Sequence, residues 1–202
     1  NFIDGLNGLV LGYYSSIIFI ILKTNLEVVF DFQNTLMINF LIILMILLLA
    51  NFTNKIFLGD NGSYLIGFLF SIYLIRIHQT NLELSPYFVI LLLWYPCFEN
   101  LFSIIRKKIS KILATKADNN HFHQLFFLYI SKKLNIKNKL IANNLTSIII
   151  SFYNLCIFYI GIQKLNSSTF QIQLITINIL IYISFYIYFK RFKEKSSDNV
   201  IK

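Results

Sequence analysis

Six apolar stretches separated by short polar segments constrain this chain more than any other feature of its sequence. They lie at about residues 9–22, 35–50, 63–77, 86–105, 140–161 and 170–189. A helix needs roughly 20 apolar residues to cross about 30 Å of hydrocarbon, and most of these stretches approach that length. Charged residues make up only 13% of the chain, whereas about 25% is usual for soluble domains. The sequence therefore predicts an all-α fold, a polytopic bundle of about six transmembrane helices.

The distribution of Lys and Arg predicts which loops face the cytoplasm. Six crossings divide the loops into two sets, and the first set comprises residues 1–8, 51–62, 106–139 and the segment from 190. This set holds 15 of the 18 basic residues. The other set holds the remaining three, Lys23, Arg76 and Lys164. Because cytoplasmic loops of membrane proteins are enriched in Lys and Arg, we place the first set in the cytoplasm.

The same pattern suggests one transmembrane domain over residues 1–189, with a cytoplasmic loop at 106–139 and a basic cytoplasmic tail at 190–202. The chain opens in what looks like the middle of a motif, so we expect it to be a fragment of a larger domain. Its net charge of +9 fits loops beside an anionic leaflet, and nucleic acid is not an expected partner. Cys97 and Cys156 lie in apolar runs and favour neither a disulfide nor a metal site.

A glycine-rich turn, Leu-Gly-Asp-Asn-Gly-Ser at 58–63, joins two of the apolar stretches. Gly59 and Gly62 permit backbone conformations closed to other residues, and Ser63 is a plausible N-cap of the next helix. A carboxylate in such a turn can hold a divalent cation, while backbone N–H groups at the helix start favour a phosphate. The alternative is that Asp60 only caps the helix.

A similar turn, Asp4-Gly5-Leu6-Asn7-Gly8, precedes the first apolar stretch on the same predicted face. Two such turns are less expected by chance than one. The alternative is that both are ordinary interfacial turns rich in Asn and Gly.

Two histidines follow in the long cytoplasmic loop, within Asp118-Asn-Asn-His121-Phe-His123. On a regular helix, residues two apart point about 200° away from each other, so joint action on one ligand requires an extended stretch or a helix end. No third His or Cys accompanies them, which disfavours structural zinc. Phosphate or diphosphate binding fits better, and interfacial histidines are the alternative. Apolar residues at helical spacing after His121 suggest a short helix along the membrane surface.

An acid, Glu99, lies inside the stretch at 86–105. An ionisable residue within a span is a functional candidate by default. The alternative is a structural partner for Asn100 or for a neighbouring helix.

The acidic turns and the histidine pair all fall on the predicted cytoplasmic face. Loops that are distant in sequence but emerge at one end of a helix bundle can build a single site between the helix ends. We therefore expect Asp4, Asp60, His121 and His123 to share one site.

These motifs resemble the polyprenyl-phosphate N-acetylhexosamine-1-phosphate transferases, glycosyltransferase family 4. The run Asn1-Phe-Ile-Asp4-Gly-Leu-Asn7-Gly-Leu looks like the second half of the family's N-x-x-N-x-x-D-G-x-D-G-L. Phe-Leu-Gly-Asp-Asn-Gly-Ser at 57–63 is similar to F-x-G-D-x-G-S, and the run at 118–123 resembles D-R-x-H-x-H. Pro96, Glu99 and Arg106 also resemble a weaker family pattern of a proline, an acid and a downstream arginine. The resemblance covers residues 1 to about 135.

The resemblance implies that the domain is catalytic and transfers N-acetylhexosamine 1-phosphate from a UDP-sugar to polyprenyl phosphate, such as undecaprenyl phosphate. UMP would leave, and the lipid-linked sugar would start a cell-envelope polysaccharide such as O-antigen. Magnesium is implied, with Asp60 as its ligand. The implied catalytic residues are Asp60, Asp4, His121 and His123. The implied cofactor-binding residues are Asn1, Asn7, Gly59, Gly62 and Ser63.

The implied partners are UDP-N-acetylhexosamine, the polyprenyl phosphate lipid and the membrane, and a second copy of the chain is a candidate partner. The implied location is the bacterial cytoplasmic membrane, with the site facing the cytoplasm. The family's paired aspartates are expected upstream of Asn1. The chain lacks an H-H-H-F-E segment, which favours the N-acetylglucosamine or modified-hexosamine branch.

Two departures from the family pattern keep alternatives open. Asn7 stands where many members have Asp, and Gln124 stands where a third His is common, so a catalytically degenerate homologue is one alternative. A membrane transporter or lipid flippase is an alternative from another class. Such proteins usually place ionisable or broken-helix sites near the middle of the membrane, where Glu99 is the candidate.

Overall fold

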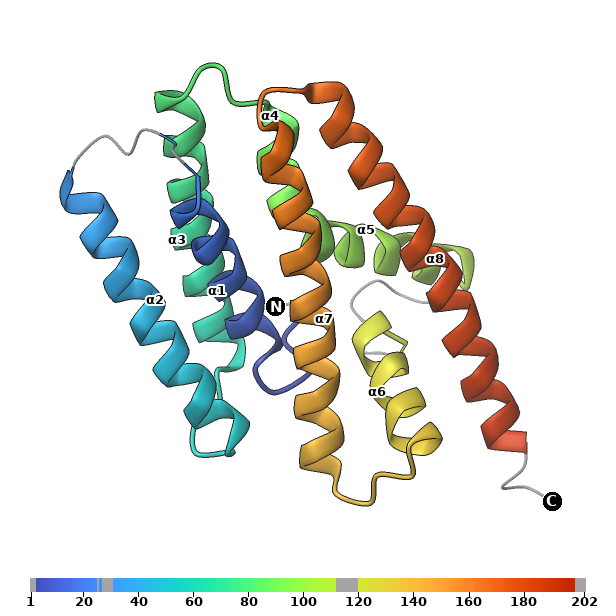
Figure 1. The fold of residues 1–202 in the computed structure, drawn as a ribbon. Coiled ribbons are helices and arrows are strands. Elements are labelled where there is room, and N and C mark those ends of the chain that lie inside the picture. The colour runs from blue at the N-terminus through green and yellow to red at the C-terminus, as the bar shows by residue number, and fades with distance from the viewer. Residues whose placement is uncertain (1–2, 25, 27–30, 112–119, 199–202) are drawn as a thin grey trace.

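The computed structural model is a bundle of helices (Figure 1). It describes residues 3–24, 26, 31–111 and 120–198. The helices are α1 (Leu9–Leu22), α2 (Asp31–Phe52), α3 (Gly59–Thr80), α4 (Pro86–Leu92), α5 (Trp94–Ile109), α6 (Phe122–Lys133), α7 (Lys139–Gly161), the 3-10 helix η1 (Ile162–Lys164) and α8 (Ser168–Asp198). No strand occurs within the described ranges. The predicted all-α class is therefore confirmed.

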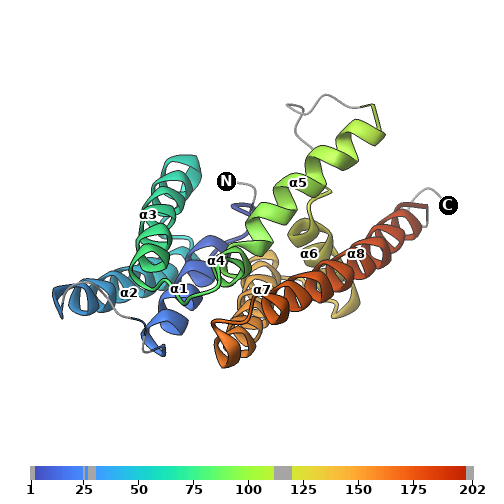
Figure 2. The ribbon, with the colours of Figure 1, turned by 90° about the horizontal axis from the view of Figure 1, so that it is seen from above.

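The helices other than α5 run roughly along one common direction, and α5 crosses it (Figure 1). Seen from above, α2, α1, α7 and α8 follow one another in a row (Figure 2). Helix α3 lies on one side of this row, and α5 extends outward on that same side. Helix α6 packs against both α7 and α8.

The predicted stretches correspond to α1, α2, α3, the pair α4 and α5, α7 and α8. Three helices are long and apolar enough to cross a membrane, within the segments Thr35–Phe52, Lys139–Lys164 and Ser168–Ser196. The bent pair α4–α5 adds a fourth if it counts as one span. Helix α1 is apolar but only 14 residues long, and α3 begins with the polar turn of Asp60. Length and composition thus support three or four of the six predicted spans.

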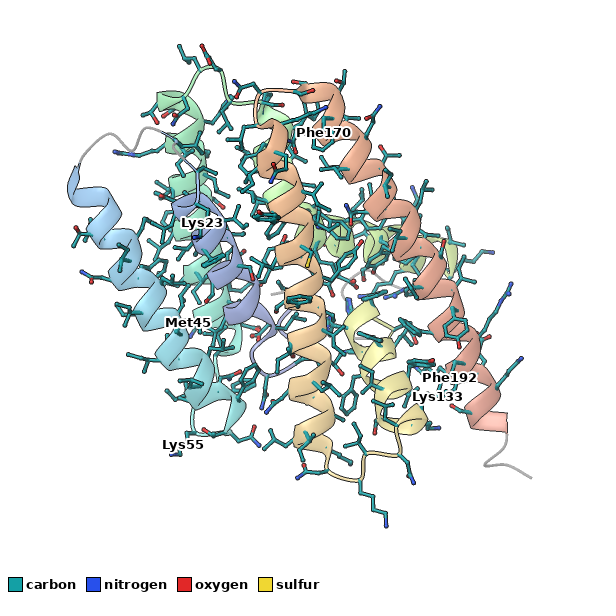
Figure 3. The ribbon with its side chains drawn as sticks, in the orientation of Figure 1. Lys23, Met45, Lys55, Lys133, Phe170 and Phe192 are labelled. Atoms are coloured by element: carbon teal, nitrogen blue, oxygen red, sulfur yellow. The ribbon has the colours of Figure 1, made fainter. Side chains whose placement is uncertain are left out.

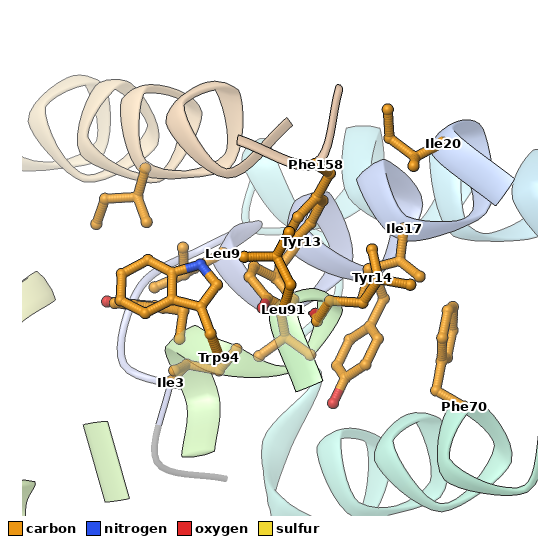
Figure 4. Packing of buried hydrophobic residues seen from close by; sticks show 14 of the residues in the cluster. Ile3, Leu9, Tyr13, Tyr14, Ile17, Ile20, Phe70, Leu91, Trp94 and Phe158 are labelled. Atoms are coloured by element: carbon orange, nitrogen blue, oxygen red, sulfur yellow. Dashed lines mark hydrogen bonds between the residues drawn. The ribbon is translucent and has the colours of Figure 1, made fainter. Parts of the chain in front are cut away.

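Helix α1 lies at the centre of the core rather than at its edge. Tyr13, Ile17 and Ile20 are fully buried, as the close view of the packing illustrates (Figure 4). The Tyr13 ring meets that of Phe158 edge to face, with centroids 5.6 Å apart. A helix that is apolar on all sides is typical of a buried position. Enclosure by α2, α3 and α7 therefore explains how so short a helix is held.

The stretch predicted as one span at 86–105 is broken instead at Leu93, where α4 and α5 meet at 72°. Pro96 explains the break, because proline has no N–H to donate to the carbonyl of Leu92 four residues earlier. The hydroxyl of Tyr13 donates to that carbonyl oxygen at 2.8 Å instead. The predicted span at 86–105 is therefore a bent pair of helices, which still passes as one candidate span.

The loop before α1 lies in the lower half of the bundle in Figure 1, and the α2–α3 and α6–α7 loops lie at its lower end. The C-terminal end of α8 lies at this end too. Helix α6 does not lie across the bundle end as expected for a surface helix, but packs lengthwise against α7 and α8. The expected tail from residue 190 is helical as far as Asp198, as the continuation of α8.

Candidate functional site

The loop before α1 is fixed by its glycine and by hydrogen bonds from two other helices. Gly8 has a φ of 76°, and a Cβ there would lie 2.1 Å from the ring of Phe52. Its N–H donates to the side-chain oxygen of Asn51 at the end of α2. The positive φ and the close ring together require glycine at this position.

Asn7, predicted to bind a cofactor, fastens this loop in the structure. Its backbone N–H donates to Oδ1 of Asn143 on α7 at 2.8 Å. Its side-chain Nδ2 donates to Oδ1 of Asn54, beyond the end of α2. An ionised Asp has no donor, so it could only accept here, from the Asn54 amide in its other orientation. The asparagine at this position therefore holds the loop against α7 and the end of α2.

The second motif forms the beginning of α3. Gly59 has a φ of 63°, and Asp60 follows it as an exposed residue in the first helical turn. Because the helix begins at Gly59, Ser63 is not its N-cap, and the Ser63 hydroxyl donates to the backbone oxygen of Asp60 at 3.0 Å. Gly62 is helical and does not use a special conformation. The earlier helix start therefore corrects two expectations, that Ser63 caps the helix and that Gly62 adopts a special backbone conformation.

Asp4 is half-buried in the loop before α1. Burial raises the pKa of its carboxyl group, and the negative charge of Asp60 raises it further. The two carboxylates are therefore close enough to interact electrostatically. Asp60 also sits at a helix N-terminus, where the helix dipole favours negative charge.

The histidine pair stands where the backbone enters α6. His121 is the N-cap residue, with an extended φ of −69° and ψ of 148°. The rings of His121 and His123 stack with centroids 5.6 Å apart and an interplanar angle of 12°. The two rings can stack because the pair occupies a helix end. A helix end is one of the two arrangements, with an extended stretch, that allow both histidines to act on one ligand. Gln124 accepts a hydrogen bond from the His121 N–H at 3.4 Å.

His123 is the buried member of the pair, with 1% of its surface exposed. Burial lowers its pKa to about 4. Its Nδ1 has no hydrogen-bond partner among the described residues. The ring is therefore neutral at physiological pH.

His123 also places the histidine segment against the loop of Asp4. A Cβ at Gly5 would lie 2.3 Å from Nε2 of His123, so only a residue without a side chain fits beside that nitrogen. This approach joins residues 118 positions apart in the chain. The loop of Asp4 and the histidine segment therefore lie against each other.

Glu99 on α5 is fully buried and lies next to His121. Its Oε1 lies 2.9 Å from Nδ1 of His121 and accepts from the N–H of Phe122 at 3.3 Å. Its Oε2 accepts from the hydroxyl of Tyr182 on α8. The sequence identified Glu99 as a candidate but gave no sign of Tyr182, which looks like one aromatic residue among many in α8.

Two basic side chains converge on Asn120, just before the histidines. Arg106 donates from Nη1 to the Asn120 backbone oxygen and, at 3.0 Å, to the hydroxyl of Tyr186. Lys193 donates to Oδ1 of Asn120 at 2.7 Å. The end of α5 and the end of α8 therefore place positive charge beside the histidine segment.

Two of the predicted site positions, Asn1 and Asp118, lie outside the described residues. Within the part of the chain that the structure describes, no group of three or more His, Cys, Asp and Glu side chains forms a metal site. Magnesium is commonly held by one or two carboxylates, with water and substrate phosphates as its other ligands. Asp4 and Asp60 carry oxygen ligands of that kind, and the charge of Asp60 acts on the carboxyl group of Asp4.

Comparison with known proteins agrees with these motifs. The model of the family "Glycosyl transferase family 4" matches residues 1–78. A curated relative from Bacillus subtilis (strain 168), described as "Probable undecaprenyl-phosphate N-acetylglucosaminyl 1-phosphate transferase", is 30% identical over 129 residues. The match covers 63% of this chain and 33% of the relative, so the chain spans about a third of that protein's length. No solved structure gives a significant match. Residues 1–78 are thus similar to glycosyl transferase family 4, and the wider match is to a relative of the same kind.

Proposed function

We propose that this chain forms part of a membrane enzyme that transfers N-acetylhexosamine 1-phosphate from a UDP-sugar to polyprenyl phosphate, releasing UMP. The match of residues 1–78 to the glycosyl transferase family supports the reaction class. The name of the relative supports undecaprenyl phosphate as the lipid and N-acetylglucosamine as the sugar. The product would serve as the lipid-linked start of a cell-envelope polysaccharide.

The observation that carries the proposal is the approach of His123 to Gly5. It places an imidazole directly beside the loop of Asp4, whose carboxyl group interacts with Asp60. The proposal thus combines acids and histidines from three separate segments, the loop before α1, the start of α3 and the start of α6. A nucleotide diphosphate needs such a mixture of metal-binding oxygens and hydrogen-bond donors.

Phosphoryl transfer of this kind depends mainly on positioning and on neutralising charge. In the proposed site, Asp4 and Asp60 would hold a magnesium ion, which would supply positive charge to offset that of the diphosphate. His121, with 14% of its side chain exposed, contacts a phosphate oxygen. His123 is neutral because of its lowered pKa of about 4, so it takes part through hydrogen bonding alone. Arg106 and Lys193 add positive potential for the anionic substrates.

The site is proposed to face the cytoplasm of a bacterial cell. Lys55 and Lys133 lie at the lower end of the bundle, and Lys23 lies towards the upper end (Figure 3). The α2–α3 loop and the end of α6 thus carry basic residues on the same side of the molecule, as the positive-inside rule expects of a cytoplasmic face. In that orientation a soluble UDP-sugar reaches the site from water and the lipid phosphate reaches it from the membrane.

The substitution Asp60→Asn tests the proposal in the membrane-embedded protein. With UDP-N-acetylglucosamine, undecaprenyl phosphate and magnesium, the wild type should release UMP, and the variant should lose at least about 100-fold of that rate, because a metal ligand is removed. Glu83→Gln is a matched control, since Glu83 is an exposed acid in the α3–α4 loop at the opposite end of the bundle. Near-normal release by the Asp60 variant would remove Asp60 from the site.

A transporter or flippase remains the second candidate, and one observation favours it. The bend of 72° between α4 and α5 lies near the buried Glu99, and broken helices with ionisable residues are typical of transporter sites. Lipid vesicles separate the two functions. Release of UMP with a lipid-linked product supports the enzyme, whereas movement of labelled lipid across the bilayer without UMP release supports the transporter.

A further inference from the structure

Hydrogen-bond donors surround the Glu99 carboxyl group, an arrangement that suits its ionised form. The Phe122 backbone N–H can only donate, and the Tyr182 hydroxyl donates to the other oxygen. An ionised carboxylate accepts hydrogen bonds and donates none. A carboxylate with no exposed surface requires such donors, because an unpaired buried charge is very unfavourable.

This environment fixes the proton on the His121 ring. The ring nitrogen that faces the Glu99 carboxylate is Nδ1, at 2.9 Å. Because the carboxylate only accepts, Nδ1 must carry the hydrogen. The hydrogen bond at one imidazole nitrogen thereby sets the chemistry of the other, so Nε2 is the nitrogen that binds or exchanges a proton.

We infer that Glu99, fixed by Tyr182, is a positioning residue that holds His121 in the Nδ1–H form and directs Nε2 towards a substrate phosphate oxygen. The inference rests on the proposed function, since it assigns a role in that same site. Glu99 does not touch the substrate. It acts through His121, in the way that a hydrogen-bonded carboxylate orients a metal-binding histidine in other proteins.

A purely structural link between helices would not need an acid at this place. Trp94 on α5 and Asn154 on α7 form such a link nearby, where Nε1 of the indole donates to Oδ1 of the amide at 2.9 Å. That link is buried and neutral, and it joins two helices without any charge. Glu99 instead places a buried negative charge against the imidazole. The carboxylate stabilises positive charge on His121 when Nε2 holds a proton for the phosphate.

Kinetics of Glu99→Gln provide the first test. Glutamine keeps the size and one acceptor oxygen but removes the charge. In the membrane-embedded protein, kcat for UMP release should fall roughly 10- to 100-fold, while KM for the UDP-sugar should change by less than about threefold. Asn154→Leu is the matched control, because it removes a buried hydrogen bond of the same region without contact to His121. It should lower thermal stability and leave kcat nearly unchanged.

Two kinetic outcomes would overturn the inference. One is an unchanged kcat for Glu99→Gln in an active protein. The other is an equal loss of kcat in the Asn154 control, which would mean that any weakening of this region has the same effect.

Nitrogen-15 NMR of the histidine rings provides a test that does not depend on activity. The chain has only three histidines, so the His121 signals can be assigned by comparison with His121→Asn. The wild type in detergent should show His121 protonated at Nδ1, and Glu99→Ala should shift it towards the Nε2–H form. A wild-type His121 protonated at Nε2 would overturn the inference. Absence of UMP release from the wild type would instead overturn the proposed function, and the NMR result would still decide how Glu99 acts on His121.

Discussion

His123 illustrates how burial alone sets the chemistry of one side chain. Its pKa is about 4 in the folded protein but about 6.5 in an unfolded chain. Between these values the unfolded chain binds the proton more strongly, so acid favours unfolding. The free energy of unfolding is therefore fully retained above about pH 6.5 and should decline by about 3 kcal/mol as the pH falls to about 4.

Thermal unfolding in detergent between about pH 4 and 8 measures this decline. His123→Gln carries no titrating ring, so its stability should depend less on pH over that range. Equal pH dependence of the variant and the wild type would show that the folded-state pKa of His123 is not depressed.

Gly5 should be intolerant of even one methyl group. In Gly5→Ala the new Cβ would lie 2.3 Å from Nε2 of His123, so the buried ring must move. We expect a loss of roughly 1 to 3 kcal/mol of stability and a lower rate of UMP release. Gly67→Ala is the control, since its Cβ would lie 3.5 Å from the Tyr14 hydroxyl, an ordinary contact. A Gly5 variant as stable and active as the Gly67 variant would contradict the close approach.

At the scale of elements, the break between α4 and α5 depends on a hydrogen bond from α1. Tyr13→Phe removes the hydroxyl that donates to the Leu92 carbonyl and leaves a buried acceptor without its partner. The expected cost is about 1 to 3 kcal/mol of unfolding free energy. Tyr73→Phe is a matched control, because the Tyr73 hydroxyl is buried and has no hydrogen-bond partner among the described residues.

Thermal or denaturant unfolding of both tyrosine variants in detergent measures the difference. We expect only the Tyr13 variant to lose stability, and the Tyr73 variant to stay within about 0.5 kcal/mol of the wild type. A Tyr13 variant as stable as the Tyr73 variant would mean that the carbonyl of Leu92 is satisfied in another way.

At the scale of the whole molecule, the positions of three lysines predict the membrane topology. Lys55→Cys and Lys133→Cys should react with a membrane-impermeant thiol reagent only from the cytoplasmic side, and Lys23→Cys only from the opposite side (Figure 3). The background should carry Cys97→Ser and Cys156→Ser, since both native cysteines are free and exposed on the described surface. Labelling of Lys55→Cys and Lys133→Cys from different sides would separate the α2–α3 loop from the histidine segment and remove the shared site.

The local features of the chain could be predicted from its sequence, because each depends on neighbouring residues. Apolar stretches define the all-α class, and the spacing of His121 and His123 limited their joint action to an extended stretch or a helix end, of which the structure has the helix end. The sequence also grouped the acidic turns and the histidines on one face, from the loop charges alone. It erred where a helix boundary mattered, as at Ser63, since the helix starts four residues earlier.

The tertiary structure decided which distant groups meet. The sequence marked Glu99 as functional or structural without choosing, and it gave no reason to single out Tyr182. Their hydrogen bond joins residues 83 positions apart, and the approach of His123 to Gly5 spans a still longer separation. Composition, periodicity and charge act over a few residues, and so they determined which segments form helices and predicted which loops share a face. Contacts between helices depend on how their side chains pack, and only the folded bundle fixes that.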